Sequence, residues 1–283
     1  MLCLTAVKLR CTPELTHVIP SPSQSRGKVT AMTSVGDDVY VLRDNSQEVD
    51  VYDAETFALK CHIAVPGLGP NAPGLAVCPN NNCLYASDWN SCSVHRIDLK
   101  AGNAVKRWAV ASRPAGLSVN KTRNLVVACY AANALQEFTT HGIIVRGVRF
   151  RDAVVSNPWH AVQLSSGKYA VSHGRSPGEV SVVGLDGRVV QWYGQPLTSD
   201  IVEMKRPGSL AVTKNDDILV ADEGNNRILL RKRSTGCVEE LGLQVDGGLQ
   251  APMGLCLDES RGRLYVGEFD GGHRVLVLDG VTV

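Results

Sequence analysis

Short apolar runs recur along the chain at an almost constant spacing. The first run of each unit combines a Pro, a small residue, a Leu and an aliphatic residue, as in APGLAV (72–77), PAGLSV (114–119), PGSLAV (207–212) and PMGLCL (252–257). Weaker copies are PWHAVQL from Pro158 and KVTAMTSV from Lys28. With the Leu position as reference, the copies stand at Ala31, Leu75, Leu117, Ala161, Leu210 and Leu255, at intervals of 44, 42, 44, 49 and 45 residues. A period of this length indicates six copies of one structural unit.

Each unit continues with further short runs that have the pattern of strands. About 12 residues after the reference position come DDVYVLRD, NCLYASDW, NLVVACYA, GKYAVSHG, DDILVADE and GRLYVGEF, followed by a third run and a more variable fourth run. These runs are rich in Val, Ile, Leu and Tyr and are bounded by Asn, Asp and Gly, which favours strands joined by tight turns. No amphipathic helical pattern lies between them, which argues against an α/β fold. Four strands in each of six units predict an all-β chain, a six-bladed β-propeller of four-stranded antiparallel blades.

The two ends of the chain complement each other. Only 28 residues follow Leu255, which is enough for three strands and short of a whole unit. Upstream of Ala31, the segment Leu15 to Ile19 stands where other units place their fourth strand. We therefore expect residues 1–27 to supply the closing strand of the last blade, so that no sheet edge stays open. The predicted blades are approximately 28–70, 71–113, 114–156, 157–205, 206–250 and 251–283.

Composition and charge narrow the choice of partner. The 283 residues are 44% apolar and 20% charged, as in folded globular chains. With 29 Lys and Arg against 28 Asp and Glu, the net charge of +1 gives no overall attraction to nucleic acid or an anionic membrane. We therefore expect any binding to depend on local surface groups.

The cysteines and the chain's hydropathy indicate the compartment. There are nine cysteines, an odd number, and no two have CxxC spacing, which argues against a closed disulfide framework and a structural zinc site. Free thiols suit a reducing compartment. The first apolar stretch is interrupted by Lys8 and Arg10 and lacks a cleavage site, and no apolar run approaches 18 residues. We expect a soluble, cytoplasmic chain without signal peptide or membrane contact, monomeric as an isolated domain.

One unit resembles a known repeat. The segment Ile218 to Ile228, ILVADEGNNRI, preceded by PGSLAV, resembles the NHL-repeat signature, and weaker versions occur at 84–97 and 264–278. The resemblance extends over residues 28–283, with degenerate first, third and fourth units. Similar NHL propellers form the C-terminal platform of tripartite-motif proteins, which implies binding of proteins or RNA. The RING, B-box and coiled-coil parts of those proteins have no counterpart in this sequence, so the resemblance implies no ubiquitin-ligase activity here.

The position of Asp222 in the signature can be compared between units. It is occupied by Arg43, Asp88, Cys129, His173, Asp222 and Glu268. In a tight turn after a strand, a carboxylate accepts backbone N–H bonds and holds the loop. We expect this structural role for Asp88, Asp222 and Glu268. The other three positions indicate either relaxed blades, which we favour, or functional departures.

An enzymatic function would depend on the residues of the inner ring of the propeller. Six-bladed propellers include metal-dependent lactonases and an amidating lyase, but the inner ring positions here are Thr30, Gly74, Gly116, His160, Ser209 and Gly254. This set lacks the carboxylates for calcium and the three ligands for a catalytic zinc. The chain has no GxSxG, GxxxxGK or GxGxxG motif after a strand. We predict no catalytic residue, cofactor or metal ligand, and a lactonase-like or lyase-like enzyme stays the least favoured alternative.

The preferred hypothesis is a recognition platform for a protein or peptide, acting through loops at one end of the ring. Loop residues in propellers form the usual recognition surface, and mixed aromatic and polar groups suit a protein better than a phosphate backbone. The predicted contact residues are Trp89, Trp159, His160, His173, Arg175, Phe269 and His273.

Binding of single-stranded RNA is the alternative hypothesis. It depends on basic clusters, formed by Lys106, Arg107, Arg146, Arg149, Arg151, Lys205, Arg206, Arg231, Lys232 and Arg233. Single-strand binding needs cations and stacking aromatics together on one face, and aromatics make up only 5% of the chain. Most of these basic residues fall in the third or fourth runs, where a solvated, charged rim is expected.

Overall fold

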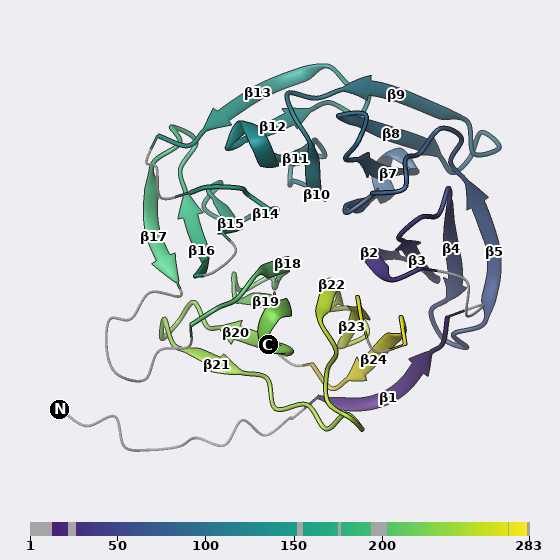
Figure 1. The fold of residues 1–283 in the computed structure, drawn as a ribbon, viewed down its shortest axis with the longest axis vertical. Coiled ribbons are helices and arrows are strands. Elements are labelled where there is room, and N and C mark those ends of the chain that lie inside the picture. The colour runs from purple at the N-terminus through teal and green to yellow at the C-terminus, as the bar shows by residue number, and fades with distance from the viewer. Residues whose placement is uncertain are drawn as a thin grey trace.

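The computed structural model is a ring of six sheets, and it describes residues 13–21, 27–151, 155–174, 177–193, 203–270 and 272–281. Each sheet has four strands in antiparallel order, and Figure 1 shows the sheets arranged around a central axis. The predicted six-bladed β-propeller of four-stranded antiparallel blades is confirmed. The limits predicted for the six units stay a prediction.

In each blade the first-named strand lies nearest the axis and the last-named strand lies at the rim. Blade 1 contains β2 (Val29–Val35), β3 (Asp38–Arg43), β4 (Glu48–Asp53) and β5 (Leu59–Ala64), and blade 2 contains β6 (Leu75–Cys78), β7 (Cys83–Asp88), β8 (Ser93–Asp98) and β9 (Val105–Ala109). Blade 3 contains β10 (Pro114–Val119), β11 (Leu125–Cys129), β12 (Ala134–Phe138) and β13 (Ile144–Arg149), and blade 4 contains β14 (His160–Gln163), β15 (Tyr169–Gly174), β16 (Gly178–Val183) and β17 (Val189–Tyr193). Blade 5 contains β18 (Pro207–Val212), β19 (Ile218–Asp222), β20 (Arg227–Arg231) and β21 (Val238–Glu240). Blade 6 contains β22 (Pro252–Asp258), β23 (Arg263–Glu268), β24 (Val275–Asp279) and β1 (Glu14–Ile19).

Helical structure in the described ranges consists of three short 3-10 turns, η1 (Pro79–Asn81), η2 (Tyr130–Ala132) and η3 (Glu223–Asn225). None of them has the length needed to cross a bilayer.

The N-terminal strand closes the ring as predicted. β1 pairs antiparallel with β24, with Leu15 opposite Leu278 and Ile19 opposite Val275. Ile19 is buried, and Figure 1 shows β1 along the outer edge of β24. The last blade is therefore built from both ends of the described chain, and its strand count matches that of the other blades.

The core lies between the blades and explains the continuous apolar runs. In β11, Leu125 and Val127 pack in a cluster with blade 2, whereas Val126 and Ala128 pack in a cluster with blade 4. Side chains of a strand alternate between the two faces of the sheet, so a sheet covered on both faces needs apolar residues at every position. One apolar cluster fills each gap between neighbouring described blades.

The two ends of the ring differ in their loops. At one end the inner strands begin beside the ends of the second strands, as the pairings of Pro114 with Cys129 and of Pro207 with Asp222 show. We call this end the entry face. The opposite end, the hairpin face, carries the turns that join the inner strand to the second strand of each blade. Of the predicted contact residues, Trp89 and Phe269 follow second strands and Trp159 precedes an inner strand, so these three belong to the entry face.

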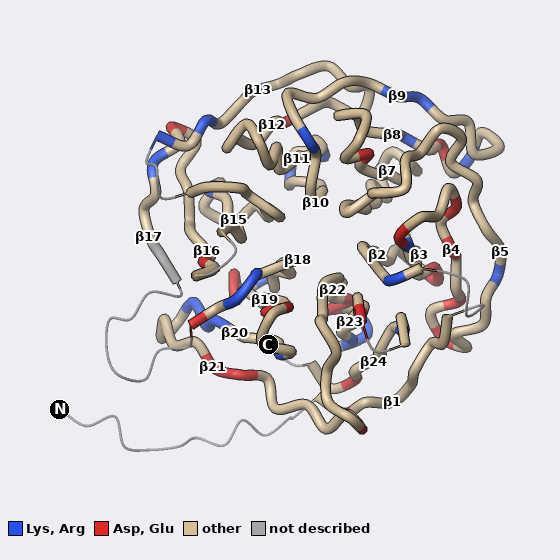
Figure 2. The backbone as a smooth tube through the Cα atoms, in the orientation of Figure 1, with Lys and Arg blue, Asp and Glu red and all other residues tan. Residues whose placement is uncertain are grey.

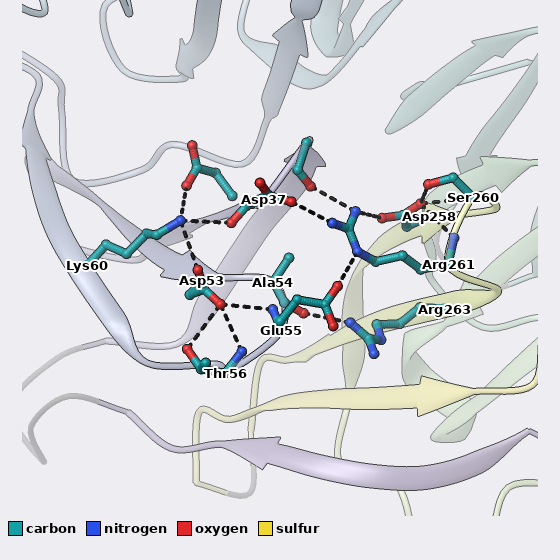
Figure 3. Close-up of polar contacts among 12 residues, drawn as sticks. Asp37, Asp53, Ala54, Glu55, Thr56, Lys60, Asp258, Ser260, Arg261 and Arg263 are labelled. Carbon is teal, nitrogen blue, oxygen red and sulfur yellow. Dashed lines mark hydrogen bonds and ion pairs between the residues drawn. The ribbon is translucent and has the colours of Figure 1, made fainter.

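On the hairpin face, Arg261 joins blade 6 to blade 1 (Figure 3). Its guanidinium bonds to Glu55 Oε1 at 2.7 Å, to Asp37 Oδ1 at 2.8 Å and to the Gly36 carbonyl at 2.8 Å. It also reaches Asp258 of its own blade at 3.0 Å. Several contacts on one ordered side chain stabilise more than an isolated surface ion pair, because the side-chain entropy is lost only once.

We expect Arg261→Ala to lower the melting temperature by about 3 °C, since a network of this kind contributes on the order of 1 kcal/mol. Differential scanning calorimetry measures the change. Arg188→Ala is the matched control, because Arg188 has an exposed ion pair with Asp186 at 3.7 Å within a single turn. Equal melting temperatures for Arg261→Ala and Arg188→Ala would contradict a role for Arg261 in ring closure.

Candidate functional site

Three carboxylates tie the loops of the entry face to the second strands. Asp88 accepts the Gly69 backbone N–H at 3.1 Å, and Asp222 accepts that of Lys205 at 2.7 Å. Glu268 accepts the Gln250 backbone N–H at 2.9 Å. Each bond joins the loop before an inner strand to the end of its neighbouring second strand. The predicted acceptor role of Asp88, Asp222 and Glu268 is therefore confirmed, and these side chains are structural.

The equivalent position of blade 1 is occupied by a buried Arg, which donates hydrogen bonds where the three carboxylates accept them. Arg43 donates from Nε to Asp50 at 3.0 Å and from Nη1 to the His273 carbonyl at 2.7 Å. Arg43 and Asp50 are each about 1% exposed, so the two charges neutralise each other out of solvent. Blade 1 thus replaces an acceptor by a donor and links to blade 6 through His273.

The equivalent residues of blades 3 and 4 are neutral and buried. Burial raises the pKa of the Cys129 thiol to about 12, so the sulfur is a thiol and not a nucleophilic thiolate at neutral pH. His173 bonds through Nε2 to Ser181 Oγ at 2.8 Å. Burial lowers the pKa of His173 to about 4, against the opposing effect of the Glu179 carboxylate.

His173, Ser181 and Glu179 do not form a catalytic triad. Glu179 Oε2 lies 3.9 Å from the same Nε2 atom that contacts Ser181, whereas a triad places the carboxylate at the other ring nitrogen. All three side chains are buried between sheets. A substrate carbonyl has no access to Ser181, so this group stabilises blade 4 rather than performing nucleophilic chemistry.

His160 uses both ring nitrogens to connect neighbouring blades. The Leu210 backbone N–H donates to Nδ1 at 2.9 Å, so Nε2 carries the proton and donates to the Leu117 carbonyl at 3.0 Å. Leu117 lies in β10 and Leu210 in β18, so His160 in β14 joins blades 3, 4 and 5. Burial lowers the pKa of His160 even though the bond to the Leu117 carbonyl raises it. Neither nitrogen is left for a proton transfer or a metal ion.

The central channel is small and lined mainly by the inner strands. Its volume is about 310 Å³, and its wall includes Thr30, Gly74, Gly116, His160, Ser209 and Gly254. At Gly116 an added Cβ would lie 2.3 Å from His160 Cδ2, so the small residue is required by close packing. No group of three His, Cys, Asp or Glu side chains within the described ranges is arranged to hold a metal ion.

Three aromatic side chains meet on the entry face. The ring centroids of Trp89 and Tyr130 are 4.9 Å apart, those of Trp89 and Trp159 are 6.1 Å apart, and those of Tyr130 and Trp159 are 6.3 Å apart. Arg113 lies with its guanidinium carbon 5.7 Å from the Trp89 ring centre. We call these four residues the aromatic cluster. The three rings are partly exposed and their inner sides pack on the core between blades 3 and 4.

Backbone bonds hold the aromatic cluster rigidly. Trp89 donates its backbone N–H to the Asn71 carbonyl at 3.0 Å, and Tyr130 donates to the Arg113 carbonyl at 3.0 Å. Trp159 donates to the Ser172 carbonyl at 2.7 Å. The rings therefore project from loops fixed to the sheets of blades 2, 3 and 4. Such fixed aromatic surfaces bind with little loss of conformational entropy.

The structure brings two of the predicted contact residues, Trp89 and Trp159, together and places two further residues, Tyr130 and Arg113, beside them. Tyr130 occupies the position of Trp89 in the next unit, directly after the second strand, and that alignment is the signal that points to it. Arg113 precedes the Pro of its inner strand, a place without a distinctive sequence signal.

Other predicted contact residues lie elsewhere on the entry face or inside the fold. Phe269 lies between blades 6 and 1, where the Lys28 ammonium is 4.2 Å from its ring centre. His273 bonds through its backbone to Arg43, while the side chains of His160 and His173 are buried. Arg175 lies outside the described residues. The described members of the predicted set thus fall into two surface groups, one at Trp89 and Trp159 and one at Phe269, while His160 and His173 are buried structural residues.

The predicted RNA-binding residues are spread over several blades. Lys106 and Arg107 lie on β9, Arg146 and Arg149 on β13 with Arg151 just beyond, Lys205 and Arg206 before β18, and Arg231, Lys232 and Arg233 at the end of β20. Four have acidic partners, in the pairs Arg146 with Glu137, Arg206 with Glu223, Lys232 with Glu239 and Arg233 with Asp216. Figure 2 shows blue segments distributed around the ring with red segments among them.

Comparison with known proteins identifies one repeat and the fold. The NHL repeat family matches residues 204–229, which cover β18, β19 and the start of β20 in blade 5. No curated protein sequence matches the chain significantly. The likeness to tripartite-motif proteins in particular stays a prediction.

Solved structures resemble the whole ring. A streptogramin B lyase is 12% identical, with a TM-score of 0.68 over 93% of this chain and 96% of that one. The hydrazine synthase of Kuenenia stuttgartiensis is 20% identical, with a TM-score of 0.66 over 99% of this chain and 80% of that one. Virginiamycin B lyase from Staphylococcus aureus is 15% identical, with a TM-score of 0.66 over 92% and 83%. At these identities the likeness concerns the fold alone, and the chain is a six-bladed β-propeller in which residues 204–229 match the NHL repeat.

Proposed function

We propose that this chain is a non-catalytic recognition platform that binds a protein partner through the entry face, with the aromatic cluster at the centre of the contact. The observation that carries the proposal is the meeting of Trp89, Tyr130 and Trp159 from three different blades beside Arg113. Trp, Tyr and Arg are the side chains that contribute most to protein interfaces when they are partly buried together.

Two features favour a protein partner over RNA or a small substrate. The basic residues suggested for RNA lie on separate blades, and four of them have acidic partners. Single-stranded RNA needs cations and stacking rings along one groove. A lyase-like reaction needs a free acid or base, and both nitrogens of His160 at the channel wall are in hydrogen bonds.

The test is a quantitative pull-down from lysate treated with RNase, with mass spectrometry of the bound proteins. We expect Arg113→Glu to reduce recovery of the partner about tenfold, and Trp89→Ala to reduce it at least as strongly, because both remove a central interface residue. Trp108→Ala is the matched control, since Trp108 is also partly exposed and packs against aromatic rings, but on the outer strand β9.

Each variant's melting temperature separates loss of binding from loss of fold. Arg113 is exposed, so its substitution changes the surface without disturbing the core. Partners that remain bound to Arg113→Glu and Trp89→Ala at the wild-type level would contradict the proposal. Recovery that disappears on RNase treatment would instead favour RNA.

A further inference from the structure

The outer strand of blade 3 has an unusual surface for a sheet edge. Among the described strands, β13 pairs only with β12, so one side of its backbone faces outwards as far as Gly147. At the end of the strand, the Arg149 carbonyl lies against Gly187 in the turn between β16 and β17. At its start, Ile143, Ile144 and Val145 are 66%, 54% and 43% exposed. Edge strands with exposed apolar residues are templates for pairing with another chain, and proteins usually protect them.

Two other outer strands, β5 and β9, show that protection. In β5 the exposed residues include Lys60 and His62, and in β9 they include Lys106 and Arg107. Charged side chains along an edge disfavour strand pairing, because a partner strand would have to desolvate them. β13 carries Arg146 and Arg149, and it differs from β5 and β9 in the three consecutive large apolar side chains that are exposed at and just before its start. In β17, Val190 is also exposed, as a single such residue among the described side chains of that strand.

The second half of β13 suits the approach of another backbone. Gly147 is exposed, and a Cβ added there would meet no atom closer than the Leu135 carbonyl oxygen at 3.9 Å. Packing within the blade therefore does not require a glycine at this position. A glycine in a strand permits close approach of a second backbone.

The charge of the edge selects the kind of partner. Arg146 and Arg149 are exposed on β13, and Arg151 follows the strand. Arg146 is paired with Glu137 at 2.8 Å, and no described acidic residue forms an ion pair with Arg149. Opposite charges on paired strands stabilise the pairing, and like charges destabilise it. A second copy of this chain would bring its own arginines to the edge, whereas an acidic segment would complement them.

We propose that the outer edge of β13 binds an extended, acidic segment of a partner protein by strand addition. The segment would extend the sheet of blade 3 through backbone hydrogen bonds to residues 144–147, with apolar side chains near Ile144 and Val145 and carboxylates near the Arg149 side chain. This surface is on the rim of the ring, on β13 in Figure 1, and it is separate from the aromatic cluster of the entry face.

The probe is a fluorescein-labelled peptide of alternating Val and Glu, with versions in which Lys replaces Glu or in which alternate amides are methylated. Fluorescence anisotropy should show binding of the unmodified Glu peptide only. The Lys peptide lacks charge complementarity with the arginines, and the methylated peptide lacks backbone N–H donors. Hydrogen exchange followed by mass spectrometry should show that the Glu peptide protects the amides of residues 143–149. Trp89→Ala should leave this binding unchanged, so that failure here and failure of the proposed entry-face function are distinguishable.

We expect Arg149→Glu to weaken binding of the Glu peptide about tenfold, as an attractive cross-strand charge pair becomes repulsive. Lys106→Glu, on the neighbouring outer strand, should leave the affinity within about twofold. Ile144→Thr keeps a β-branched residue and should weaken binding without unfolding the blade.

Three outcomes would overturn the proposal. The first is equal affinity for the methylated peptide, and the second is an Arg149→Glu variant with unchanged affinity. The third is concentration-dependent dimerisation of the chain that Ile144→Thr abolishes, since that would assign the edge to a second copy.

Discussion

Removal of residues 1–20 is expected to lower the melting temperature by more than about 10 °C. The deletion takes away β1, which pairs with β24 from Leu15 to Ile19. Ile19 is buried between blades 6 and 1, and Leu15 and Val18 pack against the cluster between blades 5 and 6. Burial of an aliphatic side chain contributes about 1.5–3 kcal/mol, so these contacts together contribute on the order of 5 kcal/mol. In a chain of this size, about 1 kcal/mol shifts the melting temperature by about 2–4 °C.

The deletion also affects the ring as a whole. Without β1, β24 becomes an unprotected sheet edge, and the contact between blades 6 and 1 loses Ile19. Each blade is stabilised by contacts with both neighbours, so loosening one interface weakens both blades beside it. We expect the truncated chain to aggregate on heating as well, because the exposed edge of β24 is apolar.

Deletion of residues 1–12 is the matched control, because it leaves β1 intact. Differential scanning calorimetry on the wild type and both truncations tests the prediction. The substitution Ile19→Ala should produce an intermediate decrease, since it removes one buried side chain and keeps the backbone pairing. A melting temperature that stays the same after removal of residues 1–20 would show that the N-terminal strand does not stabilise the ring.

Acidification from pH 6.5 to pH 4 is expected to destabilise the fold by about 3 kcal/mol through His173 alone. Burial lowers the pKa of His173 from 6.5 to about 4. Between these values the unfolded chain binds a proton at this residue and the folded chain does not, so stability falls as the pH falls. One unit of pKa difference corresponds to about 1.4 kcal/mol, which gives the magnitude.

His95 and His160 act in the same direction. Burial lowers the pKa of His95, although the Asp88 carboxylate raises it in part. Burial lowers the pKa of His160 as well. All three imidazoles are less than a tenth exposed, so burial disfavours their charged form in the folded chain.

The measurement is the free energy of unfolding in urea at a series of pH values between 4 and 7.5. His173→Gln removes the titrating group and keeps a hydrogen-bonding side chain, so the slope of stability against pH should decrease by up to about 1.4 kcal/mol per pH unit. The matched control is His141→Gln in an exposed turn. A slope that is the same for wild type and His173→Gln would contradict the assignment of a buried, neutral His173.

Much of the fold was predictable because the repeat is local. The phrase beginning each unit lies on an inner strand in blades 2, 3, 5 and 6, and the second runs form β7, β11, β19 and β23 there. The roles of Asp88, Asp222 and Glu268 were also predictable, because a carboxylate after a strand bonds to backbone donors close by. Such roles depend on the nearby loop and not on distant parts of the ring.

The candidate site could be predicted only in part. Trp89 and Trp159 were selected as loop aromatics, but their contact depends on how far each blade is rotated from the next. His160 is a predicted contact residue that the structure places in the interior instead. Both of its ring nitrogens form hydrogen bonds to backbone groups of Leu117 and Leu210, which lie 43 and 50 residues away in the sequence.

The sequence by itself determined the number of blades, the four strands of each and the closure by the N-terminal strand. These follow from apolar periodicity and turn residues, which act over a few residues or repeat in every unit. Only the tertiary structure decided that Trp89, Tyr130, Trp159 and Arg113 form one surface while the basic residues stay dispersed. The physical reason is that each of these groups belongs to a different blade or loop, so their distances are set by packing between sheets, which no local pattern encodes.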